Sequence, residues 1–147
     1  MRLMISEILE NASKLKSKTE KINYLRSQQS PALLAIIKYA LDPKVKFLLP
    51  TGPVPFKKTE AVEAQGMLYS EARKLYLFIE GGHPNLSKMK RETLFIQLLE
   101  SVDPKDAALI VGVKDKKLPY PGLTKKFMDE AFPGLLNKTE EVEKAAS

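Results

Sequence analysis

Apolar residues recur at three- and four-residue steps along much of the chain, which is the spacing of helices with one buried face. The first such stretch spans residues 3–15 and carries its apolar positions at Ile5, Ile8, Leu9, Ala12 and Leu15. Either Ser17 or Thr19 can cap a second helix, whose inner side would hold Ile22, Tyr24 and Leu25. The pattern therefore predicts two amphipathic helices at the N-terminus.

A third helix is predicted to be the most buried one. Ser30-Pro31 has the form of an N-cap followed by a proline in the first turn, and residues 32–41 are apolar almost all round. Asp42-Pro43 ends this helix, because proline disfavours the α conformation in the preceding residue. Three prolines and one glycine then fall within residues 50–55, which predicts a stiff, extended loop.

Helix signals continue through the rest of the chain. We predict a long helix over residues 60–80, ended by Gly81-Gly82, and a fifth helix over residues 87–102. Asp103-Pro104 opens a sixth helix, whose body is at residues 107–113. A short last helix over residues 125–132 is ended by Pro133-Gly134. No segment alternates polar and apolar residues convincingly, so no sheet is predicted, and two short strands near residues 47–49 are the only alternative.

The predicted fold class is all-α, with one irregular bundle of roughly six to eight helices over residues 1–136 and a flexible polar tail over residues 137–147. A length of 147 residues suits one domain. The aromatic residues expected in the core are Phe47, Phe78, Phe95, Phe127 and Phe132. Tyr120 lies between two prolines, where packing over the turn is favoured over contact with a sugar or base.

Composition excludes several classes of function. No apolar run approaches the roughly eighteen residues of a membrane span, and Glu7 and Glu10 interrupt any signal-peptide segment. The sequence has no cysteine and only one histidine, His83, which we interpret as a surface residue in a turn. Phosphate-loop motifs are absent, and the glutamates of residues 60–80 form no paired set. We expect no catalytic residue, metal, cofactor, small-molecule substrate or membrane contact, and a cytoplasmic location.

The net charge of +6 favours a polyanionic partner. Five lysines and one aspartate lie within residues 114–126, where Pro121-Gly122 predicts a turn and Thr124 a helix cap. A phosphate at such a helix start can accept backbone and lysine donors together. The predicted phosphate contacts are Lys114, Lys116, Lys117, Gly122, Thr124, Lys125 and Lys126. The alternative is a solvated loop that is merely rich in lysine.

Two further basic groups are candidates for phosphate contacts. Lys57-Lys58 follows the proline loop, and the alternative is a solubilising loop end. Lys88, Lys90 and Arg91 open the fifth helix, where positive charge opposes the helix dipole unless an anion is bound. By contrast, Lys14, Lys16, Lys18 and Lys21 are interpreted as solvated residues at a helix junction.

Several short motifs occur in an order found in one known family. They are ISEILENA at residues 5–12, TEKINYL at 19–25, LLAIIKY at 33–39, DPKDAA at 103–108, Lys117-Leu118 before Gly122-Leu123-Thr124, and FPGLL at 132–136. In this order they resemble the N-terminal DNA-binding domain of ATP-dependent DNA ligases, especially the short form of T-even-type phages, over about residues 4–136. That resemblance implies a helical domain that grips duplex DNA through backbone amides and basic loops, with Lys117, Gly122, Thr124, Lys125 and Lys126 as its phosphate-contacting group.

The sequence departs from this family in two places. Ile110-Val111 stands where the family often carries consecutive arginines, and no Lys-x-Asp-Gly motif of a nucleotidyltransferase is present. We therefore expect a non-catalytic, sequence-nonspecific protein that binds the phosphates of duplex DNA. It would be a stand-alone phage-encoded protein in the host cytoplasm, acting in DNA replication, repair or packaging. A host or phage replication protein is its expected second partner. The alternative is a protein–protein adaptor, or an inhibitor of a host enzyme, on the same fold.

Overall fold

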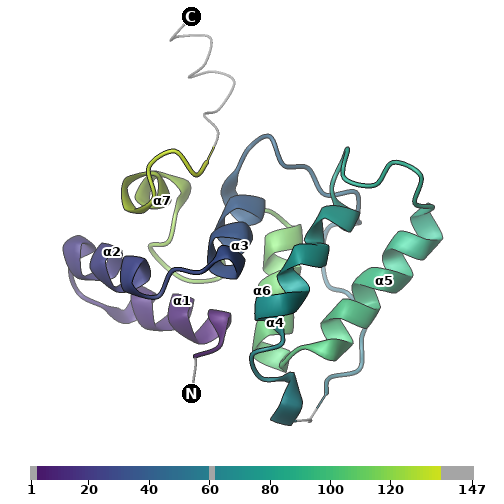
Figure 1. Cartoon of the computed structure of the whole chain (residues 1–147), viewed down its shortest axis with the longest axis horizontal. Coiled ribbons are helices and arrows are strands. Elements are labelled where there is room, and N and C mark those ends of the chain that lie inside the picture. Colours follow the sequence, from purple (N-terminus) through teal and green to yellow (C-terminus); the bar gives the residue numbers. More distant parts are fainter. Residues whose placement is uncertain (1–2, 60–61, 137–147) are drawn as a thin grey trace, which may run out of the picture.

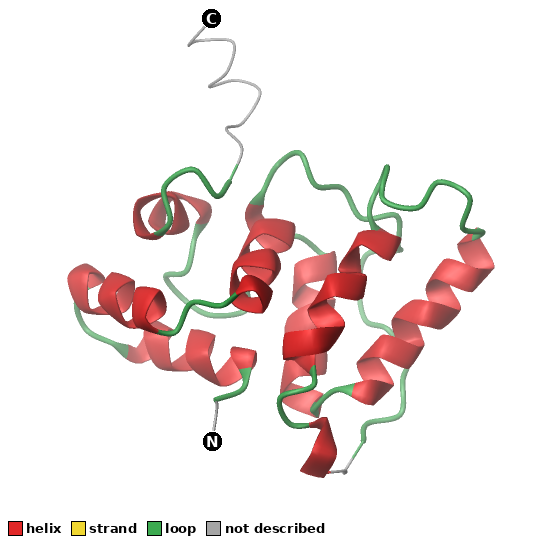
Figure 2. Cartoon of the chain, viewed as in Figure 1, coloured by secondary structure: helices red, strands yellow, loops and turns green. Residues whose placement is uncertain are grey.

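The computed structural model describes residues 3–59 and 62–136. This part of the chain contains seven α-helices, two 3₁₀ helices and no strand, so the all-α prediction is confirmed (Figure 2). The α-helices are α1 (Ile5–Lys14), α2 (Lys18–Ser27), α3 (Pro31–Leu41), α4 (Leu68–Glu71), α5 (Lys88–Ser101), α6 (Pro104–Lys114) and α7 (Lys125–Ala131), and the 3₁₀ helices are η1 (Val62–Ala64) and η2 (Ala72–Phe78). The tail over residues 137–147 lies outside the described residues.

Side-chain caps start most of the longer helices where the sequence predicts them. Ser17, and not Thr19, caps α2 by accepting the backbone N–H of Glu20 at 3.1 Å. The remaining caps are Ser30 on α3, Ser87 on α5, Asp103 on α6 and Thr124 on α7. Each side-chain oxygen satisfies an amide that has no partner within its helix.

Helix α3 lies at the centre of the bundle, as its apolar composition predicts. It packs against α6 and also against α4 and η2, while α1 packs on α2 and α5 packs on α6. Figure 1 shows α1, α2 and α7 on one side of the α3–α6 pair, with α4 and α5 on the other. Phe78 and Phe95 meet edge to face in the core, with ring centroids 5.1 Å apart. Phe127 and Phe132 are also buried, and Phe47 packs against the core from a partly exposed position.

The prediction of one long helix over residues 60–80 is wrong, because η1, α4 and η2 occupy this range. Gly66 adopts a left-handed conformation with φ of 84°, which separates η1 from α4 and ends any continuous helix there. The chain then tightens into η2 and leaves it at Ile79, which forms an isolated antiparallel bridge with Phe47. This bridge is all that corresponds to the alternative of short strands near residues 47–49. Met67, an apolar residue of the predicted helix, is 37% exposed.

No helix of the described segments is long and apolar enough to cross a membrane. His83 is exposed, in agreement with its interpretation as a surface residue.

Candidate nucleic-acid interface

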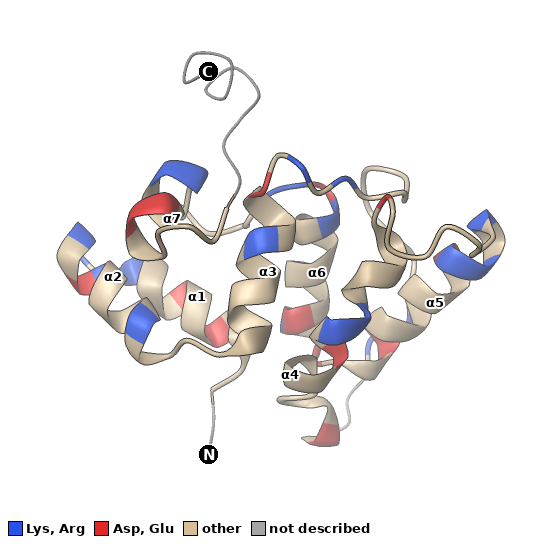
Figure 3. Cartoon of the chain, turned by 45° about the horizontal axis from the view of Figure 1, so that its top comes forward, with Lys and Arg blue, Asp and Glu red and all other residues tan. Residues whose placement is uncertain are grey.

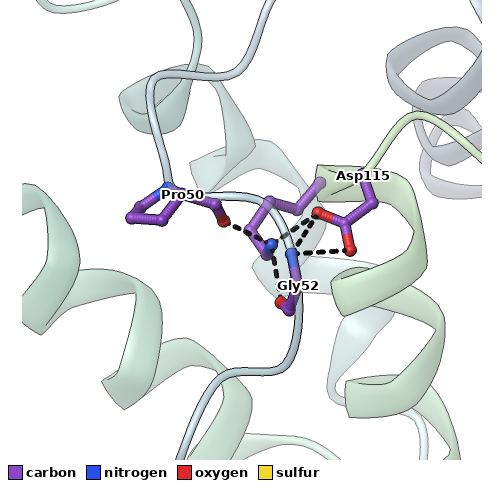
Figure 4. Close-up of polar contacts among 4 residues, drawn as sticks. Pro50, Gly52 and Asp115 are labelled. Atoms are coloured by element: carbon purple, nitrogen blue, oxygen red, sulfur yellow. Dashed lines mark hydrogen bonds and ion pairs between the residues drawn. The ribbon is translucent and has the colours of Figure 1, made fainter.

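Lys114 is buried and bonded inside the fold, which argues against its predicted contact with phosphate. Its side chain is 1% exposed, and its ammonium lies 2.6 Å from the carboxylate of Asp115. The same ammonium donates to the carbonyl oxygens of Pro50 at 2.6 Å and Gly52 at 3.0 Å, as Figure 4 shows. The carboxylate of Asp115 in turn accepts the amide of Gly52. These contacts fasten the proline loop to the end of α6.

Lys116 is also turned toward the protein. Its ammonium donates to the carbonyl oxygens of Tyr39 at 2.7 Å and Asp42 at 2.8 Å, at the C-terminal end of α3. A cation at this position satisfies carbonyls that a helix leaves unpaired. Burial lowers the pKa of Lys116 to about 8, against the opposing effect of the Asp42 carboxylate. The predicted contact of Lys116 with phosphate is therefore replaced by a cap on α3.

The remaining predicted contacts of the lysine-rich stretch lie at or near the surface. Lys117 and Lys126 are exposed, and neither has an ion pair or side-chain hydrogen bond within residues 3–59 and 62–136. Lys125 pairs with Asp129 one turn further along α7, at 3.1 Å. Thr124 caps α7 by accepting the amide of Phe127 at 3.2 Å. Only part of the predicted positive charge is thus available to a partner.

Helix α2 supplies basic residues that the sequence interpretation had assigned to a solvated junction. A surface pocket of about 350 Å³ lies between α2 and α7, and its lining comprises Lys18, Lys21, Gly122, Thr124, Lys126, Phe127 and Glu130. Lys18 forms an ion pair with Glu130. Lys21 and Lys126 have no acidic partner within the described residues. The pocket therefore joins two unpaired lysines that lie far apart in the sequence.

Arg26 holds the two helices of this pocket together. Its Nε donates to the carbonyl oxygen of Ala131 at 2.8 Å, and its Nη2 donates to that of Glu130 at 3.3 Å. These are carbonyls of the last turn of α7, which the helix itself leaves free. The guanidinium thus caps α7 and fixes it against α2 at the same time.

The two other predicted basic groups differ in their surroundings. Lys57 and Lys58 are exposed beside Glu100, whose carboxylate accepts the backbone amide of Lys57 at 2.7 Å. Lys88 and Lys90 are exposed at the start of α5. Arg91 is 8% exposed and donates from Nη2 to the carbonyl of Leu86 at 2.9 Å. Its predicted phosphate contact is wrong, because the side chain is buried beneath the start of its own helix.

Basic residues occur on α2 and η2 as well as along the upper side of the molecule in Figure 3. In Figure 3 the blue segments at the start of α7, in the loop after α3 and at the start of α5 follow the upper side. Red segments lie among them at α7 and at the end of α3, in agreement with the ion pairs of Lys125 with Asp129 and Lys38 with Asp42. The arrangement is a discontinuous row of positive charge.

A buried carboxylate lies beneath the lysine-rich loop. Asp106 is fully buried and accepts the amide of Ser6 at 3.0 Å through Oδ1, while its Oδ2 has no hydrogen-bond partner in the described structure. Burial raises the pKa of this carboxyl group. Burial, with the nearby charges of Asp106 and Glu10, also raises the pKa of Tyr120 to about 12. Tyr120 packs against the core, as the sequence favours.

Within residues 3–59 and 62–136, no group of three or more histidine, aspartate or glutamate side chains could hold a metal ion.

The model of DUF6433, a family of unknown function, matches residues 8–120 of the chain. The chain belongs to DUF6433. No curated protein and no solved structure matches it. The range matched to DUF6433 includes Lys18 and Lys21 on the α2 side of the pocket between α2 and α7. It stops before Gly122 and so excludes the α7 side of this pocket.

In this DUF6433 protein, the sequence predicts Lys117 and Lys126 as phosphate contacts, and both are exposed. Lys21 was not among the predicted contacts. The spacing of Lys14, Lys16, Lys18 and Lys21 gives no sign that two of them face a pocket. Only the packing of α2 on α7 brings them to the turn at Gly122.

Proposed function

We propose that this protein binds duplex DNA through its phosphates, without sequence preference and without catalysis. The observation that carries the proposal is the placement of Lys21 and Lys126 in one pocket without an acidic partner in the described structure. The exposed Lys117, and the lysines at the start of α5 and after the proline loop, add positive charge. Contacts of this kind position a protein on DNA and release counterions, which makes binding strongly dependent on salt.

The proposal extends to the fold and its setting. The helical bundle would be of the type found in the N-terminal domain of ATP-dependent DNA ligases, which the ordered motifs of residues 5–12 and 103–136 resemble. A phage protein acting in replication, repair or packaging within the host cytoplasm would fit this type. Support comes from the all-α architecture and from the exposed position of Gly122 and Thr124 in the loop expected to meet phosphate.

A mobility-shift series at two salt concentrations tests the proposal with intact duplex, nicked duplex, single-stranded DNA and double-stranded RNA. Each lost phosphate contact lowers the salt slope by about 0.9 for duplex DNA. The triple variant Lys21→Gln/Lys117→Gln/Lys126→Gln should therefore reduce the slope by about 2 to 3. A matched control is Arg73→Gln/Lys74→Gln/Lys105→Gln, which removes the same charge from exposed residues on η2 and α6. Equal slopes for the two triple variants would refute the assigned surface.

Two observations favour a second candidate, a protein–protein adaptor. Several predicted phosphate-binding cations, Lys114, Lys116 and Arg91, are used inside the fold, which reduces the charge available for DNA. The proline loop and α5 also enclose an apolar groove of about 260 Å³ that includes Val54, Phe95 and Ile96. An adaptor would retain a stoichiometric protein partner after nuclease treatment and lose it in the variant Val54→Glu.

A further inference from the structure

The pocket between α2 and α7 has a surplus of positive charge that the fold itself does not neutralise. Three lysines, Lys18, Lys21 and Lys126, line it together with a single acid, Glu130. Glu130 pairs with Lys18, which leaves two cationic side chains without an acidic partner in the described structure. Two lysines without an acidic partner among the described residues give this one pocket a positive potential that attracts an anion.

We propose that this pocket is a binding site for a phosphomonoester, such as the phosphate at the 5′ end of a DNA strand or of a free nucleotide. A phosphomonoester carries about −1.5 to −2 charges at neutral pH, whereas an internal phosphodiester carries only one. The surplus of two positive charges from three lysines and one glutamate matches the monoester. If the ligand is the 5′ end of a DNA strand, this inference rests on the proposed function. It adds to that function a preference for phosphorylated DNA ends.

Gly122 and Thr124 line the pocket beside Lys21. Gly122 has φ of 84° and carries no side chain, and a β-carbon there would lie 3.1 Å from the ammonium of Lys21. The hydroxyl of Thr124 accepts the amide of Phe127, and its own hydrogen can still be donated to an anion. An anion between Lys21 and Lys126 would therefore meet two charged donors and a hydroxyl.

The pocket is formed before any ligand arrives. Arg26 bonds to two carbonyls at the end of α7, and Lys18 pairs with Glu130, so α2 and α7 are connected at two places beside the pocket. Preformed sites lose less conformational entropy on binding. A volume of about 350 Å³ exceeds what one phosphate needs and lies within the range of small-ligand sites, which leaves room for the attached sugar.

The test uses the full chain and four probes: a blunt duplex with 5′-phosphates, the same duplex with 5′-hydroxyls, deoxyadenosine monophosphate and deoxyadenosine. Affinities come from fluorescence anisotropy for the duplexes and from calorimetry for the small molecules. We expect the phosphorylated duplex to bind about tenfold more tightly than its hydroxyl counterpart, because charge-assisted contacts are the strong ones. The variant Lys21→Gln/Lys126→Gln should abolish this ratio, and the control Arg73→Gln/Lys105→Gln, at exposed residues of η2 and α6, should preserve it.

The outcomes separate this inference from the proposed function. Equal affinity for the two duplexes, together with no binding of the monophosphate, would overturn the monoester site and leave general DNA binding intact. Binding of deoxyadenosine monophosphate that depends on Lys21, without binding of either duplex, would support the site with a free nucleotide as its ligand and refute the proposed function. A tenfold ratio that survives Lys21→Gln/Lys126→Gln would place the end-binding site elsewhere and overturn the assignment. Far-ultraviolet circular dichroism confirms that each variant is folded.

Discussion

The ammonium of Lys21 lies 3.1 Å from the point that a β-carbon on Gly122 would occupy. The two residues belong to different segments, α2 and the turn before α7, and the packing of those helices brings them together. Glycine at this turn therefore has two consequences. It permits the left-handed backbone, with φ of 84°, and it leaves space for the lysine.

The first prediction separates these two consequences through Gly122→Ala and Gly81→Ala. Both glycines have φ of 84°, but a β-carbon on Gly81 would meet nothing within 4 Å. Each variant should lose about 1–2 kcal/mol of unfolding free energy, because an L-residue is strained in this region. Only Gly122→Ala should also weaken DNA binding, by about twofold, since the ammonium of Lys21 must move a few tenths of an ångström away from the new methyl group. Urea denaturation and fluorescence anisotropy measure the two effects, and equal binding by both variants would contradict the role given to Lys21.

The second prediction concerns Lys114, whose ammonium is bonded inside the fold and away from the proposed DNA-binding surface. Lys114→Met should lower the unfolding free energy by roughly 3 kcal/mol, because it leaves Asp115 without its cation and two carbonyls of the proline loop without a donor. Lys117→Met, at an exposed neighbouring lysine, should change it by no more than about 0.5 kcal/mol. Urea denaturation of both variants is the measurement. A stable Lys114→Met protein with impaired DNA binding would instead restore Lys114 to the interface.

Helix starts could be predicted from the sequence because their causes are local. Ser30-Pro31 and Asp103-Pro104 combine a capping oxygen with a proline suited to the first turn, and both begin helices in the structure. Residues 60–80 could not be predicted in this way. Their apolar spacing suits a helix, but the break depends on the left-handed conformation of Gly66 and on the pairing of Ile79 with Phe47. That pairing is a contact between distant segments.

The candidate site could be predicted only in part. A count of lysines in residues 114–126 cannot distinguish an ammonium that faces water from one that bonds to distant carbonyls. Lys114 bonds to carbonyls of residues 50–52, and Lys116 bonds to carbonyls of residues 39–42. The next residue, Lys117, stays exposed. These tertiary partners decide which positive charges can meet a ligand.

The third prediction concerns the buried carboxylate of Asp106. Asp106→Asn should raise the unfolding free energy at pH 7 by about 1 kcal/mol, because it removes a charge that burial disfavours. The asparagine oxygen can still accept the amide of Ser6, and its NH₂ group can donate to the Ser6 hydroxyl, which has no partner in the described structure. The folded-state pKa is raised, so the wild type loses stability as pH rises from the unfolded value through the folded one. The advantage of the variant should therefore be largest at neutral pH and shrink on acidification, as urea denaturation at several pH values would show. A destabilised Asp106→Asn protein at pH 7 would mean that the charge is compensated.

The last prediction concerns Lys116, because burial lowers the pKa of this lysine to about 8. A lysine in the unfolded chain has a pKa near 10.4, so between these values the unfolded state binds more protons than the folded state. Stability must then rise with pH through this window. We expect the wild type to gain about 1 kcal/mol relative to Lys116→Met between pH 7.5 and 9.5, after allowance for solvent screening of a partly exposed group. The neutral amine keeps two N–H groups, which still reach the carbonyls of Tyr39 and Asp42. Paired urea titrations of both proteins cancel the contributions of other lysines and tyrosines. A relative loss of stability by the wild type would show that the cationic cap on α3 outweighs the cost of burying its charge.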